Sequence, residues 1–443
     1  MNPNERTSAL FTDLYEITMA RAYLEEGRTG LAVFETFFRR LPKNRGYVVA
    51  AGLEDVLDFL EDFRFEPDEL VWLAGLGAYP RHFLERLGQL RFDGDVWAVP
   101  EGTVVFPYEP IVQVVAPIHV AQLLETYVLN QIHFQSVVAT KAARMVDAVR
   151  GRTLVEFGAR RAHGTDAAIK AVRASYLAGF DGTSNVLAAR HYGIPPFGTM
   201  AHSYVQAHGS EARAFEIFAR LFPGTTLLVD TYDTLRAVDE VVALARRMGP
   251  DFQVGAIRLD SGDLGALARE ARARLDAAGL GQVKIFASSN LDEWELAALV
   301  GAGAPIDAFG VGTRLVISTD APTLDMAYKL VEYEGVGRTK LSAGKPIYPG
   351  GKQVFRRVEG GRFVEDVIAR HSEWFPGEPL LVQVMAGGKR LLREGLPQAR
   401  RRAREQVAAL PPEVRALDPT AEYPVRFSKR LQQDLEALRQ ARA

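Results

Sequence analysis

Residues 254–289 read VGAIRLDSGDLGALAREARARLDAAGLGQVKIFASS. Two short apolar runs flank one stretch with helical spacing, so the segment predicts a strand, a helix and a second strand. The alternation continues on both sides, with the runs TLVEF (153–157), PFGTMA (196–201), TLLVD (226–230) and IDAFGVG (306–312). Successive strand ends lie roughly 20–40 residues apart, which brackets the ~30 residues of a βαβ unit. Repeated units of this kind predict a parallel sheet, either doubly wound or curved into a barrel.

The remaining sequence has a mixed pattern. The segment TDLYEITMARAYLEEG (12–27) has the 3-4 apolar spacing of an amphipathic helix that begins near Tyr15. AVFETFFRRLP (32–42) predicts a strand, GLEDVLDFLEDF (52–63) a helix, and GKPIYPGGKQVFRRVEGGRFVEDVIA (344–369) a set of meandering strands. A length of 443 residues exceeds one ordinary core, so we expect two or three domains.

Charge and composition exclude several classes of function. A formal net charge of -2 provides no global field for nucleic acid or an anionic membrane, so we expect neither as a partner. The chain has no run of the roughly 20 apolar residues that a membrane span needs. Its N-terminus lacks the apolar core of a signal peptide, and we expect a cytoplasmic protein. The absence of cysteine excludes disulfides, thiolate zinc sites and a cysteine nucleophile.

Reactive side chains follow the predicted strands, at the point where each strand ends. Because the carboxyl ends of parallel strands meet at one edge, we expect these side chains to form an active site. Asp and Ser at such positions also cap helices, but Arg and His do not cap helix N-termini. The candidates in chain order are Arg160, Thr199, His202, Asp230, Asp233, Arg258, Asp260, Ser288, Gly310, Gly312 and Thr313.

Three of these segments suggest a particular chemistry. Arg258 can donate two hydrogen bonds to phosphate oxygens, while Asp260 can hold ribose hydroxyls or a hydrated magnesium ion; the alternative is a salt bridge at a strand end. The turn Gly310–Gly312 can present backbone N–H groups to a phosphate, or is simply a tight turn. His202 is either catalytic or structural. No zinc-peptidase, serine-hydrolase, Walker or Rossmann motif is present.

Longer motifs stand in a fixed order along the chain: TDLYEITM (12–19), VEFGARRAHGTDAAIKAVRASYLAGFDGTSNVLAA (155–189), GTMAHS (198–203), LVDTYDTL (228–235), IRLDSGDL (257–264), FASSNLDE (286–293), FGVGTRLV (309–316) and KQVFR (352–356). These motifs resemble the nicotinate phosphoribosyltransferase family of type II phosphoribosyltransferases. The resemblance covers roughly residues 8 to 360, in matching order. It implies an α/β fold, with an incomplete α/β (TIM-like) barrel joined to an α/β sandwich that the N- and C-terminal segments build together.

The fold that the resemblance implies divides the chain into four parts. We expect residues 1–130 to form the N-terminal part of the sandwich and 131–345 the barrel with the active site. Residues 346–410 then return to the sandwich, and 411–443 form a charged helical tail.

The resemblance also implies a reaction. Nicotinate, phosphoribosyl pyrophosphate and ATP give nicotinate mononucleotide, pyrophosphate, ADP and phosphate, the first step of NAD salvage from nicotinate. ATP is a co-substrate and Mg²⁺ a cofactor. The partners are these small molecules and a second copy of the chain, in a homodimer with shared active sites.

Each site residue carries over by its place in a motif. His202 matches the histidine that the family phosphorylates, and Asp260 is a second catalytic residue and the candidate metal ligand. Tyr15 would stack on the pyridine ring from the neighbouring subunit, with Phe157 as the other wall. The nicotinate-binding residues are Tyr15, Phe157, Arg160, Ser184, Thr199 and Arg258; those for phosphoribosyl pyrophosphate are Arg258, Asp260, Ser288, Gly310, Gly312 and Thr313; Asp230 and Asp233 lie near the ATP phosphates or magnesium.

The nearest alternative is a nicotinamide phosphoribosyltransferase. In that enzyme an aspartate follows the FxGT turn, whereas here the turn FDGT (180–183) is followed by Ser184. A carboxylate at this position would repel nicotinate by about 4 kcal/mol at 4 Å and an effective dielectric near 20. Ser184 therefore favours the acid, although it could instead cap the next helix.

Other classes of function gain less support. A barrel aldolase or sugar-phosphate isomerase would need a Schiff-base lysine or a general base on a strand, and Lys284 lies before the middle of its strand. No motif favours a metabolite sensor or a cytokine-like protein.

Overall fold

The computed structural model describes residues 7–341 and 347–441. The chain forms two compact units: unit 1 comprises Met1–Thr140 and Ala321–Ala443, and unit 2 comprises Lys141–Asp320. The predicted boundary after residue 130 falls inside the helix α6 (Glu125–Ala148), and the one after 345 falls outside the described residues. Residues 326–337, assigned to the barrel by the sequence, belong instead to a sheet of unit 1.

Unit 2 is built on a six-stranded sheet in which every pairing between strands is parallel. β7 and β8 are the two edges, and no ladder between described strands joins them. Neighbouring strands follow chain order from β8 to β11 and then return to β6 and β7, which is the cyclic order of an α/β barrel that is open between β7 and β8; this confirms the predicted fold. In sheet order the strands are β7 (Gly182–Thr183), β6 (Thr153–Glu156), β11 (Ala308–Val311), β10 (Lys284–Ser289), β9 (Ala256–Leu259) and β8 (Thr226–Leu228).

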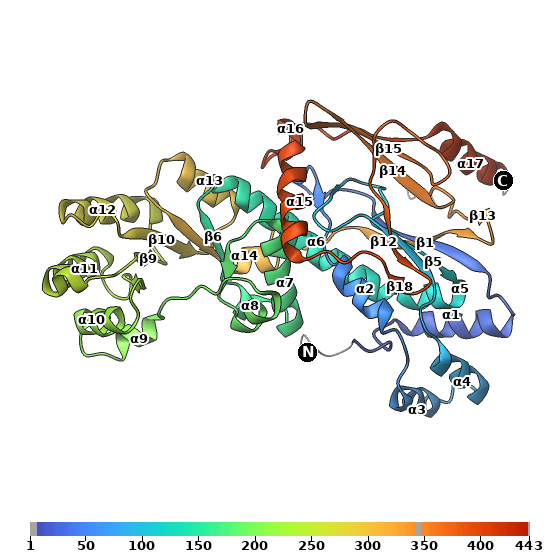
Figure 1. The fold of residues 1–443 in the computed structure, drawn as a ribbon, viewed down its shortest axis with the longest axis horizontal. Coiled ribbons are helices and arrows are strands. Elements are labelled where there is room, and N and C mark those ends of the chain that lie inside the picture. The colour runs from blue at the N-terminus through green and yellow to red at the C-terminus, as the bar shows by residue number, and fades with distance from the viewer. Residues whose placement is uncertain (1–6, 342–346, 442–443) are drawn as a thin grey trace. The chain divides into compact units, whose positions relative to one another are not determined.

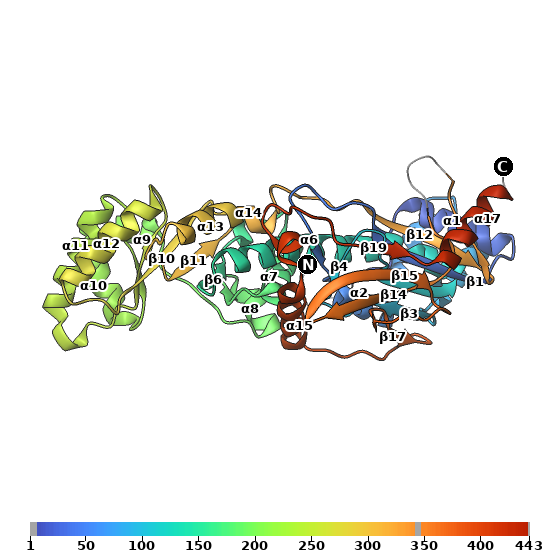
Figure 2. The same cartoon turned by 90° about the horizontal axis from the view of Figure 1, so that it is seen from above.

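The helices of unit 2 follow the strands in alternation and lie beside the sheet (Figures 1 and 2). In α11 the buried residues Ala237, Val238, Val241, Val242 and Leu244 form one apolar face, as the sequence spacing predicts. The helices are α7 (Thr165–Ala178), α8 (Val186–Tyr192), α9 (His202–Gln206), α10 (Glu211–Leu221), α11 (Thr234–Met248), α12 (Leu264–Ala277), α13 (Glu293–Gly301) and α14 (Thr313–Val316).

The predicted strand PFGTMA is wrong. Residues 196–201 form only an isolated bridge, between Pro196 and Thr183, and His202 begins α9 instead of ending a strand. Proline has no N–H to donate, and the Pro195–Pro196 pair removes two successive ladder donors. The strand that pairs with β6 is the two-residue β7, which lies in the FDGT turn.

Unit 1 contains a seven-stranded sheet drawn from both ends of the chain. All its pairings are antiparallel, with β1 between β12 and β5, and β3 between β5 and β17. This interleaving confirms the predicted sandwich of N- and C-terminal segments. The strands in sheet order are β13 (Val336–Gly337), β12 (Met326–Tyr333), β1 (Leu31–Phe38), β5 (Val112–Pro117), β3 (Asp95–Ala98), β17 (Val382–Ala386) and β18 (Lys389–Arg390).

A four-stranded sheet and a set of helices complete unit 1. The sheet runs β16 (Glu378–Pro379), β14 (Lys352–Glu359), β15 (Arg362–Arg370) and β19 (Val425–Phe427), and β2 (Val48–Val49) pairs with β4 (Val104–Val105). The predicted charged tail is therefore part strand, because β19 pairs with β15. The helices are α1 (Leu14–Glu25), α2 (Leu53–Glu61), α3 (Pro67–Gly75), α4 (Arg81–Gln89), α5 (Ile118–Ala121), α15 (Leu396–Ala409), α16 (Pro412–Arg415) and α17 (Lys429–Gln440).

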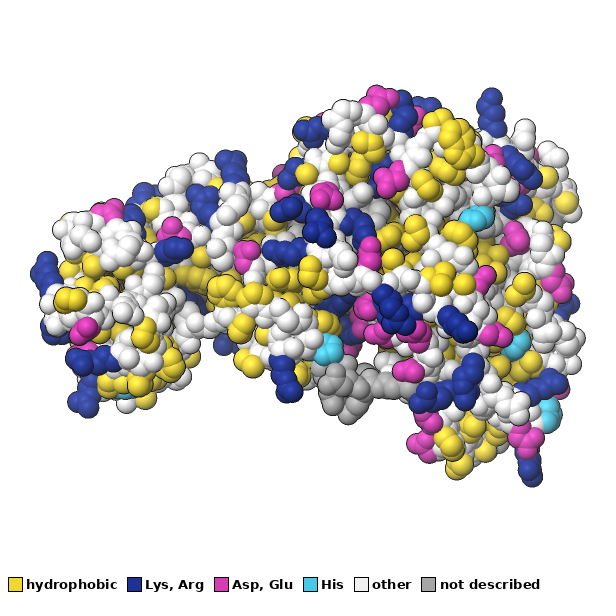
Figure 3. Space-filling view, in the orientation of Figure 1, with side chains coloured by type: hydrophobic (Ala, Val, Ile, Leu, Met, Phe, Trp, Pro, Cys, Tyr) yellow, Lys and Arg dark blue, Asp and Glu magenta, His cyan; other side chains and the backbone are white. Residues whose placement is uncertain are grey.

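The surface shows both charge signs. Figure 3 shows Lys and Arg side chains interspersed with Asp and Glu over the visible face, in keeping with the balanced composition. Within residues 7–341 and 347–441, no helix has the length and apolarity required to span a membrane.

A buried ion cluster joins β14 to β15. Arg356 and Asp366 are opposite each other in the ladder, and both are fully buried. Arg356 Nη2 donates to Asp366 Oδ2 at 2.5 Å, and the Tyr423 hydroxyl donates to Asp366 Oδ1 at 2.9 Å. Burial raises the pKa of Glu109 well above its usual range, and the nearby Asp366 carboxylate raises it further. The cluster ties the C-terminal Tyr423 to the sheet.

Asp366→Asn should destabilise the protein by about 3 kcal/mol, because it leaves a buried guanidinium without its main counter-charge. The matched control is Glu359→Gln, which breaks the exposed pair with Arg357 on the same strand and should cost less than about 1 kcal/mol. Urea titrations followed by far-UV circular dichroism would compare the two variants. Equal midpoints would contradict the role given to the cluster.

Candidate active site

Unit 2 has a pocket of about 570 Å³ that seven of the predicted site residues line. They reach it from four places: the loop after β6, the turn after β7, the segment before α9, and the end of β9. The parallel sheet thus brings together side chains that are about 100 residues apart in sequence, as predicted. The seven are Phe157, Arg160, Ser184, Thr199, His202, Arg258 and Asp260.

Arg258 lies at the centre of the polar contacts. Its Nη2 donates to Asp260 Oδ1 at 2.8 Å, its Nε to Ser288 Oγ at 2.7 Å, and its Nη1 to Thr199 Oγ1 at 3.2 Å. Ser288 Oγ in turn donates to Asp260 Oδ1 at 2.5 Å. The guanidinium also lies 5.6 Å from the centre of the Phe157 ring. These contacts hold the cation in one orientation, beside an aromatic face that can pack against a planar ligand.

His202 begins α9, with its side chain 42% exposed. Its Nδ1 is 3.2 Å from Thr231 Oγ1, and its Nε2 is 3.9 Å from Asp260 Oδ2. When Nδ1 donates to Thr231, Nε2 carries the free lone pair. The imidazole is then open to an incoming electrophile while a carboxylate lies nearby.

The two aspartates after β8 have different surroundings. Asp233 caps α11, since its Oδ1 accepts the N–H of Arg236 at 2.9 Å. Asp230 Oδ2 accepts the Asp260 N–H at 3.0 Å and the Ser261 hydroxyl at 2.6 Å, while its Oδ1 is buried without a hydrogen-bond partner. No group of three or more His, Asp or Glu side chains within the described residues is arranged to hold a metal ion.

The glycine turn after β11 packs against the pocket wall. A Cβ on Gly310 would lie 2.7 Å from the ring of Phe157, so glycine at this position lets the ring lie over the strand. Gly312 precedes the one-turn helix α14, which begins at Thr313. The sequence predicted a phosphate role for this turn, and packing alone accounts for Gly310.

Ser184 does not cap the helix that follows it. The N-cap of α8 is Asn185, whose Oδ1 accepts the N–H of Ala188 at 3.2 Å. Ser184 is exposed and lines the pocket, and its own N–H donates to the carbonyl of Glu156 at 2.9 Å. The alternative that Ser184 only caps the next helix is therefore wrong, and the Ser184 hydroxyl remains available to a ligand.

Some pocket residues were missed by sequence reasoning. Phe197 and Met200 line the pocket from the segment that the sequence treated as a regular strand. Thr231, the partner of His202, stands in the quoted motif LVDTYDTL but had no assigned role. Buried Glu156 and Thr183 connect the pocket loops, and the GT of the FDGT turn was the available signal for Thr183.

Tyr15 belongs to unit 1, in the first turn of α1, and its side chain is 45% exposed. Partial burial raises the pKa of its hydroxyl, and the nearby Glu125 carboxylate raises it further, so the side chain stays neutral. Phe11 and Leu14 beside it are also exposed.

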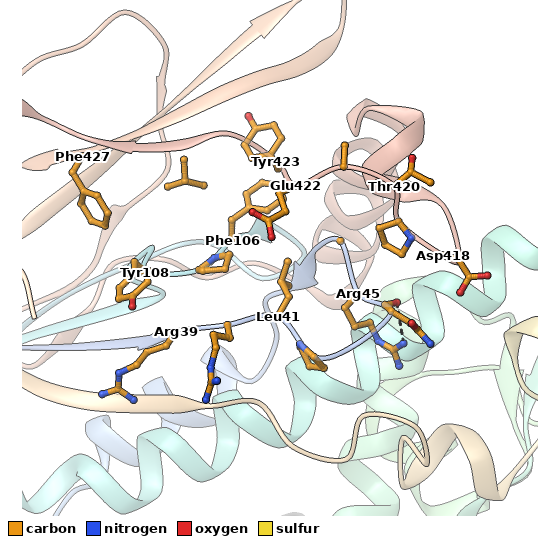
Figure 4. Close-up of a pocket in the computed structure, with 18 residues that line it drawn as sticks. Arg39, Leu41, Arg45, Phe106, Tyr108, Asp418, Thr420, Glu422, Tyr423 and Phe427 are labelled. Atoms are coloured by element: carbon orange, nitrogen blue, oxygen red, sulfur yellow. Dashed lines mark hydrogen bonds between the residues drawn. The ribbon is translucent and has the colours of Figure 1, made fainter. Parts of the chain in front are cut away.

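Unit 1 has a larger pocket, of about 770 Å³, which contains none of the predicted site residues (Figure 4). Phe106 and Tyr423 stack with ring centres 4.0 Å apart on one side, and Arg39 and Arg45 come from the segment after β1. Arg39 already pairs with Asp325 at 3.3 Å. Seven of the residues predicted from the sequence line the pocket of unit 2 instead.

The fold and the pocket define an α/β-barrel enzyme class in which a fixed arginine lies beside an aromatic ring. Family models extend this description to almost the whole chain. The nicotinate phosphoribosyltransferase (NAPRTase) N-terminal domain matches residues 10–133, the NAPRTase family 153–371, and the C-terminal domain 370–435. The chain belongs to the nicotinate phosphoribosyltransferase family.

Individual relatives match 82–99% of the chain. The chain is 62% identical over 440 residues to nicotinate phosphoribosyltransferase pncB2 of Mycobacterium tuberculosis, covering 99% of this chain and 95% of the relative. It is 44% identical over 375 residues to the Bacillus subtilis nicotinate phosphoribosyltransferase, covering 82% and 76%. The crystal structure of human nicotinic acid phosphoribosyltransferase superposes with a TM-score of 0.87 at 32% identity, covering 96% and 99%.

Proposed function

We propose that the chain transfers the phosphoribosyl group of phosphoribosyl pyrophosphate to nicotinate, and that it couples this transfer to ATP hydrolysis through His202. Nicotinate phosphoribosyl transfer, a step of NAD salvage, is the activity that the family supports. The observation that carries the proposal is the fixed Arg258 between Phe157, Thr199, Asp260 and Ser288 in one pocket.

The pocket and the strand ends beside it have groups for each part of the substrates. Phe157 offers a face to the pyridine ring, and the Ser184 hydroxyl can donate to its carboxylate. Arg160 is exposed and has no hydrogen bond or ion pair within the described chain, so its guanidinium is free for an anion. Arg258, Ser288 and the turn Gly310–Thr313 would hold the phosphoribosyl group. The ring nitrogen then attacks C1 of the ribose as the bond to pyrophosphate breaks.

Magnesium fits the acidic side of the pocket. Mg²⁺ prefers one or two carboxylates together with water and substrate phosphates. Asp230, with a buried and unpartnered Oδ1, and Asp260 supply that number of carboxylates. The ion would neutralise the developing charge of the pyrophosphate.

Phosphoryl transfer to His202 is the basis proposed for ATP coupling. An N–P bond forms at Nε2 as the P–O bond to ADP breaks, and water later hydrolyses the phosphohistidine. The Thr231 contact is compatible with the tautomer that has a free Nε2, in which Nδ1–H donates to the hydroxyl. We further propose that the chain acts in the cytoplasm, as a homodimer in which Tyr15 of the second copy closes the pocket.

Product analysis tests the function directly. Nicotinate, nicotinamide and quinolinate would be offered together with phosphoribosyl pyrophosphate, ATP and Mg²⁺. We expect nicotinate mononucleotide, pyrophosphate and ADP. A product from nicotinamide alone would identify the alternative enzyme, and no nucleotide product at all would overturn the proposal.

His202→Ala should keep the fold and a slow, ATP-independent transfer, but lose ATP stimulation and labelling by γ-labelled ATP. The reason is that the imidazole is the proposed phosphoryl acceptor. His191→Ala, on a different exposed helix position of unit 2, is the control and should label normally. Full ATP-coupled activity in the His202 variant would rule out the phosphohistidine.

Ser184→Asp should lower kcat/KM for nicotinate steeply, with a smaller gain for nicotinamide. Repulsion between like charges about 4 Å apart costs roughly 1 kcal/mol in water and roughly 4 kcal/mol at an effective dielectric near 20. One amide hydrogen bond, by contrast, gains only about 1 kcal/mol. Ser184→Asn is the control: asparagine has a volume similar to that of aspartate but no charge, so this variant separates the effect of charge from that of size. An unchanged preference for nicotinate in the folded Asp variant would place specificity elsewhere.

Mixing Tyr15→Ala with His202→Ala subunits tests the shared site. If Tyr15 acts across the dimer, each heterodimer has one intact site, so random exchange should restore about a quarter of wild-type ATP-coupled activity. The assay uses a nicotinate concentration at which each variant alone is inactive. Mass spectrometry would first verify that the subunits exchange. If activity does not recover after verified exchange, Tyr15 acts within its own chain.

A further inference from the structure

Glu156 ends β6 and is 1% exposed, yet the described chain gives it no ion pair. Burial raises the pKa of its carboxyl group, while hydrogen bonds from Thr183 and Gly158 act in the opposite direction. A carboxylate in such a position is costly unless its oxygens are hydrogen-bonded. The hydrogen-bond partners of Glu156 therefore indicate its structural role.

Both carboxylate oxygens of Glu156 accept a hydrogen bond. Oε2 accepts from the Thr183 hydroxyl at 2.5 Å, and Oε1 accepts from the N–H of Gly158. The carbonyl of Glu156 also accepts the Ser184 N–H, at 2.9 Å. One residue thus contacts both the loop after β6, which carries Phe157 and Arg160, and the turn that carries Ser184.

Thr183 extends these contacts to the third loop of the pocket. Its N–H donates to the Pro195 carbonyl at 3.1 Å, and its carbonyl accepts the Phe197 N–H at 2.8 Å. Its Oγ1 also accepts the N–H of Asn185, the cap of α8, at 3.0 Å. The three pocket segments around residues 157–160, 184–186 and 196–202 are therefore attached, directly or through Thr183, to Glu156.

These three pocket segments form the base-binding wall, and the sheet itself holds this wall weakly. β7 has only two residues and pairs with β6 at two positions, Val155 with Gly182 and Glu156 with Thr183. It lies at the edge of the sheet, and beyond it is the single bridge to Pro196. The side-chain bond from Thr183 to Glu156 supplies a fixed contact where the ladder is shortest.

We propose that Glu156, acting through the Thr183 hydroxyl, is a positioning residue that fixes the base-binding wall and thereby sets the preference for the acid over the amide. It does not touch the substrate. It holds the backbone of the two loops that carry the Ser184 hydroxyl and the Arg160 guanidinium, through the N–H groups of Ser184 and Gly158. The inference rests on the proposed nicotinate transfer.

Thr183→Val tests the proposal, because valine has nearly the volume of threonine but carries a methyl group in place of the hydroxyl, which removes the bond to Glu156 and the acceptor of the Asn185 N–H. We expect the KM for nicotinate to rise about tenfold, in line with the loss of one buried hydrogen bond. The KM for phosphoribosyl pyrophosphate should stay within about twofold, and the ratio of kcat/KM for nicotinate over nicotinamide should fall by about tenfold. Thr183→Ser, which retains the hydroxyl, should restore both values.

Ser175→Ala is the matched control. It removes another buried hydroxyl of unit 2, one that donates to the Val172 carbonyl inside α7 at 3.0 Å. It should leave both KM values and the acid-to-amide ratio unchanged. Wild-type protein that makes no nicotinate mononucleotide would contradict the proposed function, whereas an active wild type isolates the test of Glu156.

The remaining outcomes also decide the matter. An unchanged acid-to-amide ratio in folded Thr183→Val, or equal losses for both substrates, would overturn the proposal. Failure of Thr183→Ser to restore the ratio would do the same. If Thr183→Val does not fold, Glu156→Gln carries the same expectation; if neither folds by circular dichroism, the pair is only structural and the proposal fails.

Discussion

Parallel pairing is the constraint on which the site depends. When strands run in one direction, all their carboxyl ends open at one edge, and the loops there must share a small space. Unit 2 meets this constraint with strands of two to six residues, so the loops provide much of the structure near that edge. Most side chains of the candidate site belong to loops, and the parallel sheet brings those loops together at one edge.

Electrostatics in this protein is local. A chain with a net charge of -2 has no general attraction for anionic substrates. The positive charge for an anionic substrate is therefore supplied locally by Arg258. Three hydrogen bonds fix its guanidinium, one of them to Asp260, which is only two residues away in sequence. In the proposed function, the same carboxylate that orients the cation would also bind magnesium.

Sequence patterns predicted the parallel sheet and the polar pocket residues that follow regular strands, and the family resemblance implied the two-part sandwich. The patterns were strong ones: short apolar runs such as KIFASS, with amphipathic helices between them. Sequence reasoning failed at 196–201, where apolar composition suggested a strand but two prolines prevent a ladder. It also missed Glu156, because no local pattern shows that a carboxylate will be buried against a threonine 27 residues later. Contacts of that kind are set by strand order, which periodicity does not encode.

The interleaved sheet of unit 1 has a consequence for synthesis on the ribosome. β1 ends at Phe38, but its neighbour β12 begins only at Met326, about 290 residues later. At roughly 5–20 residues per second, the apolar edge of β1 waits on the order of 15–60 s for its partner. The segment that forms unit 2 leaves the ribosome complete in the meantime. The order of translation therefore favours folding of the catalytic half first, with the N-terminal strands the part most in need of a chaperone.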